Sequence, residues 1–112
     1  MDKIDYRLKI TFLGTGTSQG IPVIGSKDPV CLSDDPRDNR LRVSVLVQVE
    51  DLNLVIDCGP DFRQQMLRAG VSRLNAVLFT HGHRDHISGL DDIRAFNYLQ
   101  KSPMDIYAEE RV

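Results

Sequence analysis

The order of apolar and polar residues predicts three β-strands in the first half of the chain. Residues 8–13 alternate apolar with polar side chains, which is typical of a strand with one face against a core. Glycine and proline then interrupt the pattern, so residues 14–39 are expected to form a long loop. Valine at every second position of residues 43–49 predicts a strand with one buried face, and an apolar run follows at residues 52–57. Because only residues 50–51 separate these two strands, we expect them to pair as an antiparallel hairpin.

A helix is predicted over residues 62–69. Asp61 stands where an N-cap residue would bind the first free amides of the helix. Gly70 stands where the chain would leave the helix in a left-handed conformation. The face of this helix that we expect to be buried carries Phe62, Met66 and Ala69.

The rest of the chain alternates strand and helix patterns. Residues 76–80 form a short apolar run, as expected for a strand buried on both faces. A second helix is predicted to start at Ser88 or Asp91 and to reach about Leu99, before a last strand at residues 104–108. Strands that come first and then alternate with helices indicate an α/β (α+β) fold, in which helices are layered on a mixed sheet.

Composition and charge exclude several classes of protein. A length of 112 residues corresponds to one domain, and 41% hydrophobic with 27% charged residues is ordinary for a globular chain. The net charge of −2 gives no electrostatic reason to expect nucleic acid as an obligatory partner. No apolar run reaches the roughly 20 residues of a membrane span, and the charged N-terminus is not a secretory signal. Cys31 and Cys58 do not form a disulfide framework and fit a reducing cytoplasm.

All the histidines of the chain lie within the six residues His81-Gly82-His83-Arg84-Asp85-His86. Imidazole and carboxylate ligands together suit Zn²⁺, with Mn²⁺ or Fe²⁺ as alternatives. In an extended segment, His81 and His83 project to the same side. Asp85 and His86 can join them only if the chain bends, or if they bind a second ion beside the first. The alternative interpretation is a polar loop whose histidines titrate in solvent.

Three segments, taken together, resemble the metallo-β-lactamase fold superfamily of hydrolases. They are residues 12–22 (FLGTGTSQGIP), residues 56–63 (IDCGPDFR) and residues 80–92 (THGHRDHISGLDD). The last contains the His-x-His-x-Asp-His string that is the main metal-binding motif of this superfamily. Among its branches, the chain looks most like the phosphodiesterase group that contains the cyclic phosphodiesterase of the carbon–phosphorus lyase pathway. The tRNA 3′-processing endonucleases are the next most similar branch.

The resemblance implies a set of ligands for two divalent metal ions. His81 and His83 match ligands of the first ion, and Asp85 and His86 match ligands of the second. Asp57 matches an aspartate that lies behind the ligands and orients them, a role that agrees with the usual second hydrogen bond of metal-bound imidazoles. The alternative for Asp57 is a turn residue at a strand end. Zn²⁺ is the expected metal, with Mn²⁺ as an alternative.

Two glycine- and cysteine-containing regions are less informative. Residues 14–20 would be either a phosphate-facing loop or simply a turn-rich connection. Relatives in this branch often carry a Cys-x-Cys-x-x-Cys trio for a structural zinc, but the matching positions here are Ser26, Asp28 and Cys31. Because one cysteine cannot close a tetrahedral site, we predict no structural zinc. Asp91 and Asp92 are assigned to a helix N-terminus rather than to the metals.

The resemblance implies a metal-dependent hydrolase, most specifically a phosphodiesterase that uses a water activated by two metal ions. Asp85 is the residue expected to handle the proton of that water. Superfamily members are about twice as long, so residues 1–112 are expected to be the N-terminal half of one αββα sandwich domain, inactive in isolation, with the remaining ligands beyond Val112. The partner would be a small phosphodiester, with nucleic acid unsupported. Two alternatives stay open, namely another hydrolase of the superfamily (tRNA 3′-end, thioester or lactone) and a non-catalytic metal-binding module.

Overall fold

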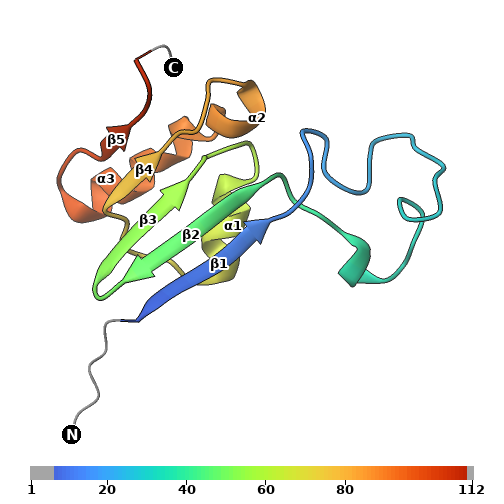
Figure 1. The fold of residues 1–112 in the computed structure, drawn as a ribbon, viewed down its shortest axis with the longest axis horizontal. Helices are drawn as coiled ribbons and strands as arrows, with labels where there is room; N and C mark the ends of the chain where they lie inside the picture. Colours follow the sequence, from blue (N-terminus) through green and yellow to red (C-terminus); the bar gives the residue numbers. More distant parts are fainter. Residues whose placement is uncertain (1–6, 111–112) are drawn as a thin grey trace, which may run out of the picture.

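A computed structural model describes residues 7–110 and consists of one sheet with helices on one side (Figure 1). The sheet has five strands in the order β1-β2-β3-β4-β5. The strands are β1 (Leu8–Gly14), β2 (Ser44–Val49), β3 (Leu52–Ile56), β4 (Ala76–Leu78) and β5 (Asp105–Tyr107). The helices are α1 (Phe62–Ala69), α2 (Arg84–Ile87) and α3 (Arg94–Gln100), with 3-10 turns η1 (Pro36–Asp38) and η2 (Leu90–Ile93). None of the helices in the described part of the chain is long and apolar enough to cross a membrane.

The sheet is antiparallel at one end and parallel at the other. β2 pairs antiparallel with both β1 and β3, and the β2–β3 pair is the predicted hairpin. β4 pairs parallel with β3 and with β5. Parallel neighbours need a crossover connection, and α1 supplies it between β3 and β4, while α2, η2 and α3 lie between β4 and β5. The carboxyl ends of β3 and β4 therefore meet at the same edge, where the histidine segment begins.

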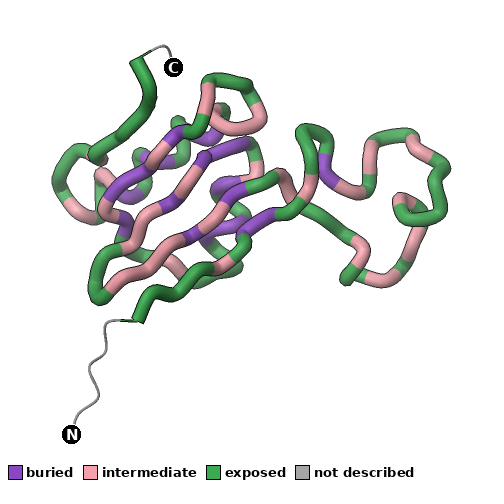
Figure 2. The backbone as a smooth tube through the Cα atoms, viewed as in Figure 1, coloured by how far each residue is buried: buried purple, intermediate pink, exposed green. Residues whose placement is uncertain are grey.

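The core lies between the sheet and helices α1 and α3. Val55 and Val77 of the two central strands are fully buried, and the rings of Phe62 and Phe96 meet edge to face with their centroids 6.1 Å apart. Phe62 belongs to α1 and Phe96 to α3, so both helices pack on the same layer of side chains. In Figure 2 the buried residues gather in this layer, while residues 15–43 form an arm that is mostly exposed or half-buried.

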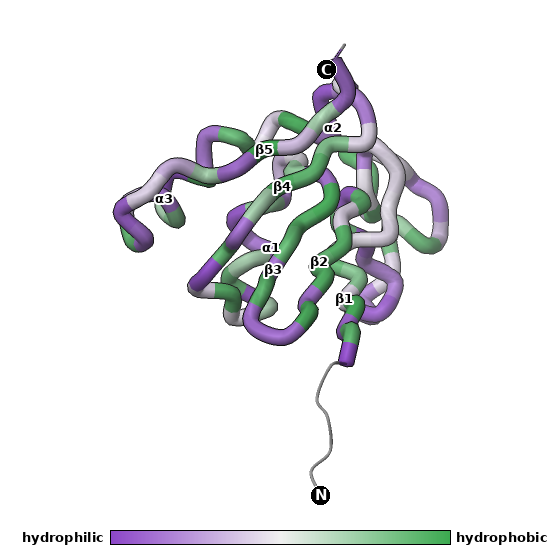
Figure 3. Tube along the Cα trace, turned by 60° about the vertical axis from the view of Figure 1, so that its left-hand side comes forward, coloured by the Kyte–Doolittle hydropathy of each residue, from purple (hydrophilic) through white to green (hydrophobic). Residues whose placement is uncertain are grey.

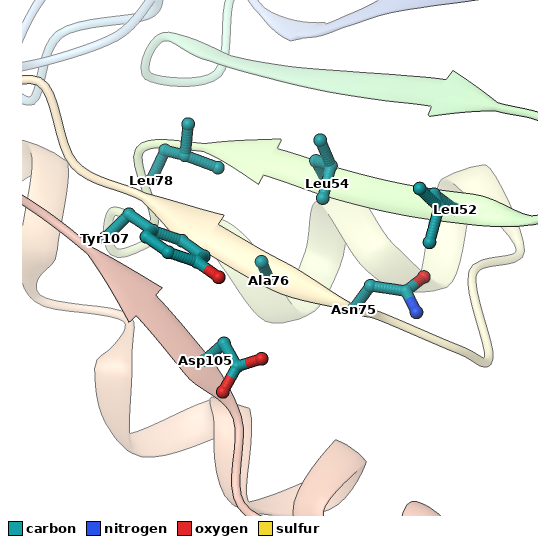
Figure 4. A pocket seen from close by; sticks show the side chains of 7 residues that line it. All are labelled: Leu52, Leu54, Asn75, Ala76, Leu78, Asp105 and Tyr107. Carbon is teal, nitrogen blue, oxygen red and sulfur yellow. The ribbon is translucent and has the colours of Figure 1, made fainter.

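The opposite face of the sheet, which we call the open face, is apolar but uncovered. It carries Leu8, Ile10 and Phe12 of β1, Val45 and Val47 of β2, Leu52 and Leu54 of β3, Leu78 of β4 and Tyr107 of β5. Figure 3 shows hydrophobic residues along β2, β3 and β4, and Figure 4 shows side chains of β3, β4 and β5 around a hollow on this face. Phe12 is 68% exposed and Tyr107 is 57% exposed. A continuous apolar surface of this kind marks an interaction surface, because antiparallel sheets facing water usually present polar residues there.

The 112-residue chain by itself is therefore expected to self-associate through the open face. The double substitution Ile10→Lys and Phe12→Lys should increase the fraction of monomer in sedimentation velocity runs, because it places two charges on an apolar surface. Ile24→Lys is the matched control, since Ile24 is fully exposed on the arm and lies away from the sheet. A wild-type chain that stays monomeric and binds no hydrophobic dye would show that the open face does not mediate self-association.

Most predicted elements are confirmed, with differences in detail. In β2 the buried side chains are Ser44 and Leu46, whereas the alternating valines lie on the open face. In α1 the buried residues are Phe62, Gln65 and Met66, so the prediction that Ala69 is buried was wrong. Gly70 ends α1 in the left-handed conformation with φ 69°, as predicted.

The expected second helix is broken into two pieces, and Asp61 does not cap α1 with its side chain. η2 and α3 together replace the helix predicted from Ser88 or Asp91 to Leu99. The Asp61 carboxylate instead accepts hydrogen bonds from the backbone amide of Arg42, at 2.9 Å, and from its guanidinium, at 3.1 Å. A charged partner from the end of the arm thus replaces the predicted local cap, and it fastens the arm to α1.

Candidate metal centre

The histidine segment lies at the carboxyl end of β4 and changes direction after two residues. His81 follows β4 in irregular chain, and His83 has extended backbone angles. The chain then turns into α2, where the amide of His86 donates to the carbonyl of His83 at 2.9 Å. The sequence allowed Asp85 and His86 to join the first two histidines only if the chain bends. This bend is present, and it turns both residues back toward His81 and His83. The helix α2 itself was not predicted.

The structure places each of the four predicted ligands next to at least one other. The ring centroids of His81 and His83 are 4.5 Å apart, and those of His81 and His86 are 4.0 Å apart. The Asp85 carboxylate lies 3.2 Å from Nε2 of His86. Three imidazoles and a carboxylate form a donor set that suits a borderline divalent ion. His81 lies beside both His83 and His86, so the assignment of His81 and His83 to one ion and of Asp85 and His86 to another stays a prediction.

Asp57 lies behind the histidines, and its carboxylate has three hydrogen-bond partners. Its Oδ1 accepts from the backbone amide of Thr80 at 2.8 Å. Its Oδ2 accepts from the Thr80 hydroxyl at 2.7 Å and is 2.6 Å from Nδ1 of His86. Oxygen and nitrogen atoms of Asp57, His81 and His86 lie within 4.8 Å of one another, so these three could also be considered as a ligand set. The three hydrogen-bond partners around the Asp57 carboxylate favour the supporting role instead, because they occupy most of its roughly four lone-pair sites.

The backbone of Asp57 has a strained conformation, which its hydrogen bonds to neighbouring strands maintain. Asp57 is buried, at 5% exposure, and has φ 67°, which is uncommon for a residue other than glycine. Its amide donates to the carbonyl of Leu78 at 2.8 Å, and its carbonyl accepts from the Ser44 hydroxyl at 2.9 Å. These bonds to β2 and β4 hold the strained residue at the end of β3. They also explain why a serine occupies a buried position of β2.

The loop after Asp57 packs directly on the histidine segment. The amide of Cys58 donates to the carbonyl of His86 at 2.7 Å, and the amide of Gly89 donates to the carbonyl of Cys58 at 2.9 Å. A Cβ atom at Gly59 would collide with the carbonyl oxygen of Asp85, and one at Gly89 would collide with the carbonyl oxygen of Gly59. The two glycines therefore permit a backbone-to-backbone contact that fixes the metal segment against the end of β3.

Sequence reasoning missed two residues of this site, Ser44 and Thr80. A signal for Ser44 was present, because a small polar residue among alternating valines interrupts an apolar strand. Thr80 was included in the strand pattern, and nothing in the pattern assigns a role to its hydroxyl. Its partners, Asp57 and His81, become visible only when β3 and β4 are placed side by side.

The other candidate regions have hydrogen-bond partners within the arm. The amide of Gly16 donates to the carbonyl of Leu41 at 2.7 Å, so part of the 14–20 segment pairs with the returning end of the arm, which favours a turn-rich connection. In the arm, Cys31 Sγ accepts from the amide of Val23 at 3.4 Å, and Ser26 Oγ accepts from the amide of Asp28 at 3.2 Å. The lack of a structural zinc at these positions stays a prediction.

The two thiols are expected to differ in reactivity. Burial raises the pKa of the Cys58 thiol to about 12, and the negative charges of Asp92 and Asp57 add to the effect. At neutral pH Cys58 is therefore a protonated thiol, and only the thiolate is nucleophilic. We expect iodoacetamide to modify the half-buried Cys31 first in the folded protein, and Cys58 only after unfolding, as measured by peptide mass spectrometry. Equal modification of both residues in the native state would contradict this assignment.

Comparisons with known proteins agree with the fold and with the motif. Residues 52–112 match the family model described as the β-lactamase superfamily domain. A crystal structure of a diphosphatase from the PhnP family superposes with a TM-score of 0.87 and 45% identity, over 94% of this chain and 44% of that one. The resemblance to the metallo-β-lactamase superfamily is thereby confirmed, with a PhnP-family protein as a similar solved structure.

Two curated relatives are much longer than this chain. An octanoyltransferase of Porphyromonas gingivalis is 44% identical over 94% of this chain, which corresponds to 21% of that protein. A ribonuclease Z of Methanosarcina mazei is 34% identical over 92% of this chain, or 30% of that protein. The chain thus spans less than a third of these relatives. The family model matches more than half of the chain, which therefore belongs to the β-lactamase superfamily. The sheet and the histidine segment show that it carries part of the metallo-β-lactamase fold.

Proposed function

We propose that this chain supplies the histidine-bearing part of a metal-dependent phosphodiesterase that uses two divalent ions, Zn²⁺ in the first place and Mn²⁺ as the alternative. The observation that carries the proposal is the convergence of His81, His83, Asp85 and His86 at one sheet edge, with Asp57 buried behind them. A polar loop with freely titrating histidines would not need a strained, buried aspartate to hold one of its rings.

His86 is the best-defined of the proposed ligands. Its Nδ1 is 2.6 Å from the Asp57 carboxylate, so Nδ1 carries the proton and donates it to that oxygen. Nε2 is then left with a lone pair, and this is the atom that faces the Asp85 carboxylate at 3.2 Å. Asp57 thereby fixes both the orientation and the tautomer of the ring, which raises the basicity of the proposed ligand atom.

Asp85 is proposed to hold and pass on a proton during hydrolysis. Its side chain is 20% exposed, so it is reachable from solvent, unlike Asp57, whose side chain is 7% exposed. A carboxylate has two oxygens, so Asp85 can bind an ion with one and accept a hydrogen bond from water with the other. When bound, divalent ions would lower the pKa of water toward about 7 and polarise a phosphoryl oxygen.

The names of two relatives support a phosphorus-containing substrate. A diphosphatase and a ribonuclease are both named for the hydrolysis of bonds at phosphorus. The open face and the incomplete ligand set support the further proposal that residues 1–112 form the N-terminal half of one domain, with the remaining ligands on another segment. Two free thiols support a reducing, cytoplasmic environment.

The test is hydrolysis of bis-p-nitrophenyl phosphate by the polypeptide that contains this chain and the rest of its domain, loaded with Zn²⁺ or Mn²⁺. We expect metal-dependent turnover that is lost in His83→Ala, and at most weak metal binding without turnover for residues 1–112 alone. Inertness of the loaded protein toward this diester, combined with cleavage of a thioester or lactone, would replace the proposal with another hydrolase of the superfamily. A loaded protein that hydrolyses none of these substrates, and whose behaviour is unchanged in His83→Ala, would indicate a non-catalytic module.

A further inference from the structure

The hydroxyl of Thr80 lies between two residues of the site. Its oxygen is 2.7 Å from Oδ2 of Asp57 and 2.8 Å from Nδ1 of His81. The backbone amide of the same residue donates to Oδ1 of Asp57 at 2.8 Å. Thr80 is thus held at two points on one carboxylate, and this fixes the direction in which its hydroxyl faces His81.

The proton count allows one fully satisfied arrangement of these groups. A hydroxyl has a single hydrogen to donate, and an ionised carboxylate can only accept. The Thr80 hydroxyl must therefore donate to Asp57. Its oxygen is then left to accept, so the hydrogen bond to His81 requires the proton to be on Nδ1 of that ring. The reverse arrangement would place a hydroxyl oxygen 2.7 Å from a carboxylate oxygen with no hydrogen between them.

Both histidines next to Asp57 are consequently placed in the same tautomer. His86 donates Nδ1–H to Asp57 directly, and His81 donates Nδ1–H to the Thr80 hydroxyl, which donates to Asp57. In His81 this leaves the lone pair on Nε2, whereas Nε2 of His86 lies 3.2 Å from Oδ2 of Asp85. The centroids of the two rings are 4.0 Å apart, so the two histidines are direct neighbours.

We propose that Thr80 is a positioning residue, through which Asp57 sets the tautomer and orientation of His81 as it sets those of His86 directly. A single buried carboxylate thereby prepares two rings, one by contact and the other through a hydroxyl. The part of this proposal that concerns metal affinity rests on the proposed function, whereas the tautomer of His81 does not.

The direct test is the tautomer of each histidine in the metal-free protein, read from long-range ¹H–¹⁵N NMR correlations of the imidazole nitrogens at mildly alkaline pH. We expect Nδ1–H for both His81 and His86 in the wild type. In Thr80→Val, which keeps the shape but removes the hydroxyl, His81 should shift toward the Nε2–H form that predominates for the neutral histidine side chain in water. His86 should keep Nδ1–H, because its bond to Asp57 is direct.

Two further variants separate the hydroxyl from general damage. Thr80→Ser should restore the wild-type tautomer of His81, and Thr11→Val, a threonine of the edge strand β1, should leave both rings unchanged. If Thr80→Val does not fold, as shown by loss of the His86 signal, Thr80→Ala provides the same comparison. An unaltered His81 tautomer without the hydroxyl, or no recovery in Thr80→Ser, would overturn the proposal.

Zn²⁺ affinity, measured by competition with a chromophoric chelator, provides the second readout. Loss of an outer hydrogen-bond partner typically weakens metal binding about 10–100-fold, and we expect this for Thr80→Val with recovery in Thr80→Ser. Affinity that is equal in all three proteins would contradict a role in metal binding. The tautomers are read without metal or substrate, so they do not depend on hydrolase activity. A failure of the proposed hydrolase function can therefore be distinguished from a failure of the tautomer proposal.

Discussion

Replacement of His86 by alanine is expected to lower the affinity of the protein for Zn²⁺ by on the order of 100-fold or more, beyond the usual effect of losing an outer partner. The substitution removes a proposed ligand atom, Nε2, and also the only ring that donates directly to Asp57 in the described structure. The buried carboxylate would lose one of its three donors, so we also expect a loss of stability of about 1–3 kcal/mol. Chelator competition measures the first effect and urea unfolding the second.

Arg84→Ala is the matched control for this experiment. Arg84 lies in the same short helix, α2, but its side chain offers no atom that binds a cation. Its substitution should leave both the metal affinity and the unfolding free energy close to those of the wild type. If His86→Ala binds Zn²⁺ as tightly as the wild type, the ion is held elsewhere and the proposed ligand set is wrong.

The second large effect is expected for Asp57→Asn. Asparagine tolerates the left-handed backbone at this position, so the substitution tests the carboxylate rather than the φ angle of 67°. The amide NH₂ would face a donor, either the Thr80 amide or Nδ1 of His86, and a buried donor without an acceptor costs about 1–3 kcal/mol. We expect that loss in urea unfolding, together with about a 10–100-fold weaker Zn²⁺ affinity.

Two other substitutions set the scale for this result. Asp57→Ala should be worse by about 1 kcal/mol, because alanine pays the additional cost of a left-handed backbone. Asp91→Asn should change stability by less than about 0.5 kcal/mol, since Asp91 forms an exposed ion pair with Arg94 at 3.2 Å. If Asp57→Asn and Asp91→Asn lower the free energy of unfolding by equally small amounts, Asp57 is an ordinary strand-end residue.

The metal segment could be recognised from the sequence because its residues are consecutive. His81, His83, Asp85 and His86 need only one bend of the chain to meet, and no distant contact has to be inferred. The bend itself, helix α2, was missed because four residues are too few to produce a helical period. Thr80 and Ser44 were missed because their roles depend on hydrogen bonds to Asp57, which lies 23 and 13 residues away on a neighbouring strand end.

The strands were predictable, whereas the identity of the buried face was not. Alternation with period two shows that β2 has two different faces, but it does not say which one the helices cover. The valines of β2 looked like the buried set, yet α1 and α3 pack on the face of Ser44 and Leu46. Both faces are apolar enough for either choice, so the decision comes from the position of the helices. Asp61 shows the same limit, because its long-range partner Arg42 replaces the local cap.

The central claim is that the histidine segment is a metal centre, and X-ray absorption at the zinc edge tests it most directly. In the zinc-loaded protein we predict a first shell of nitrogen and oxygen at about 2.0–2.1 Å, with the outer-shell signature of imidazole rings. That imidazole signature should diminish in His81→Ala. A shell of sulfur at about 2.3 Å, which would place the zinc on Cys31 or Cys58, or a wild-type spectrum without imidazole, would contradict the account.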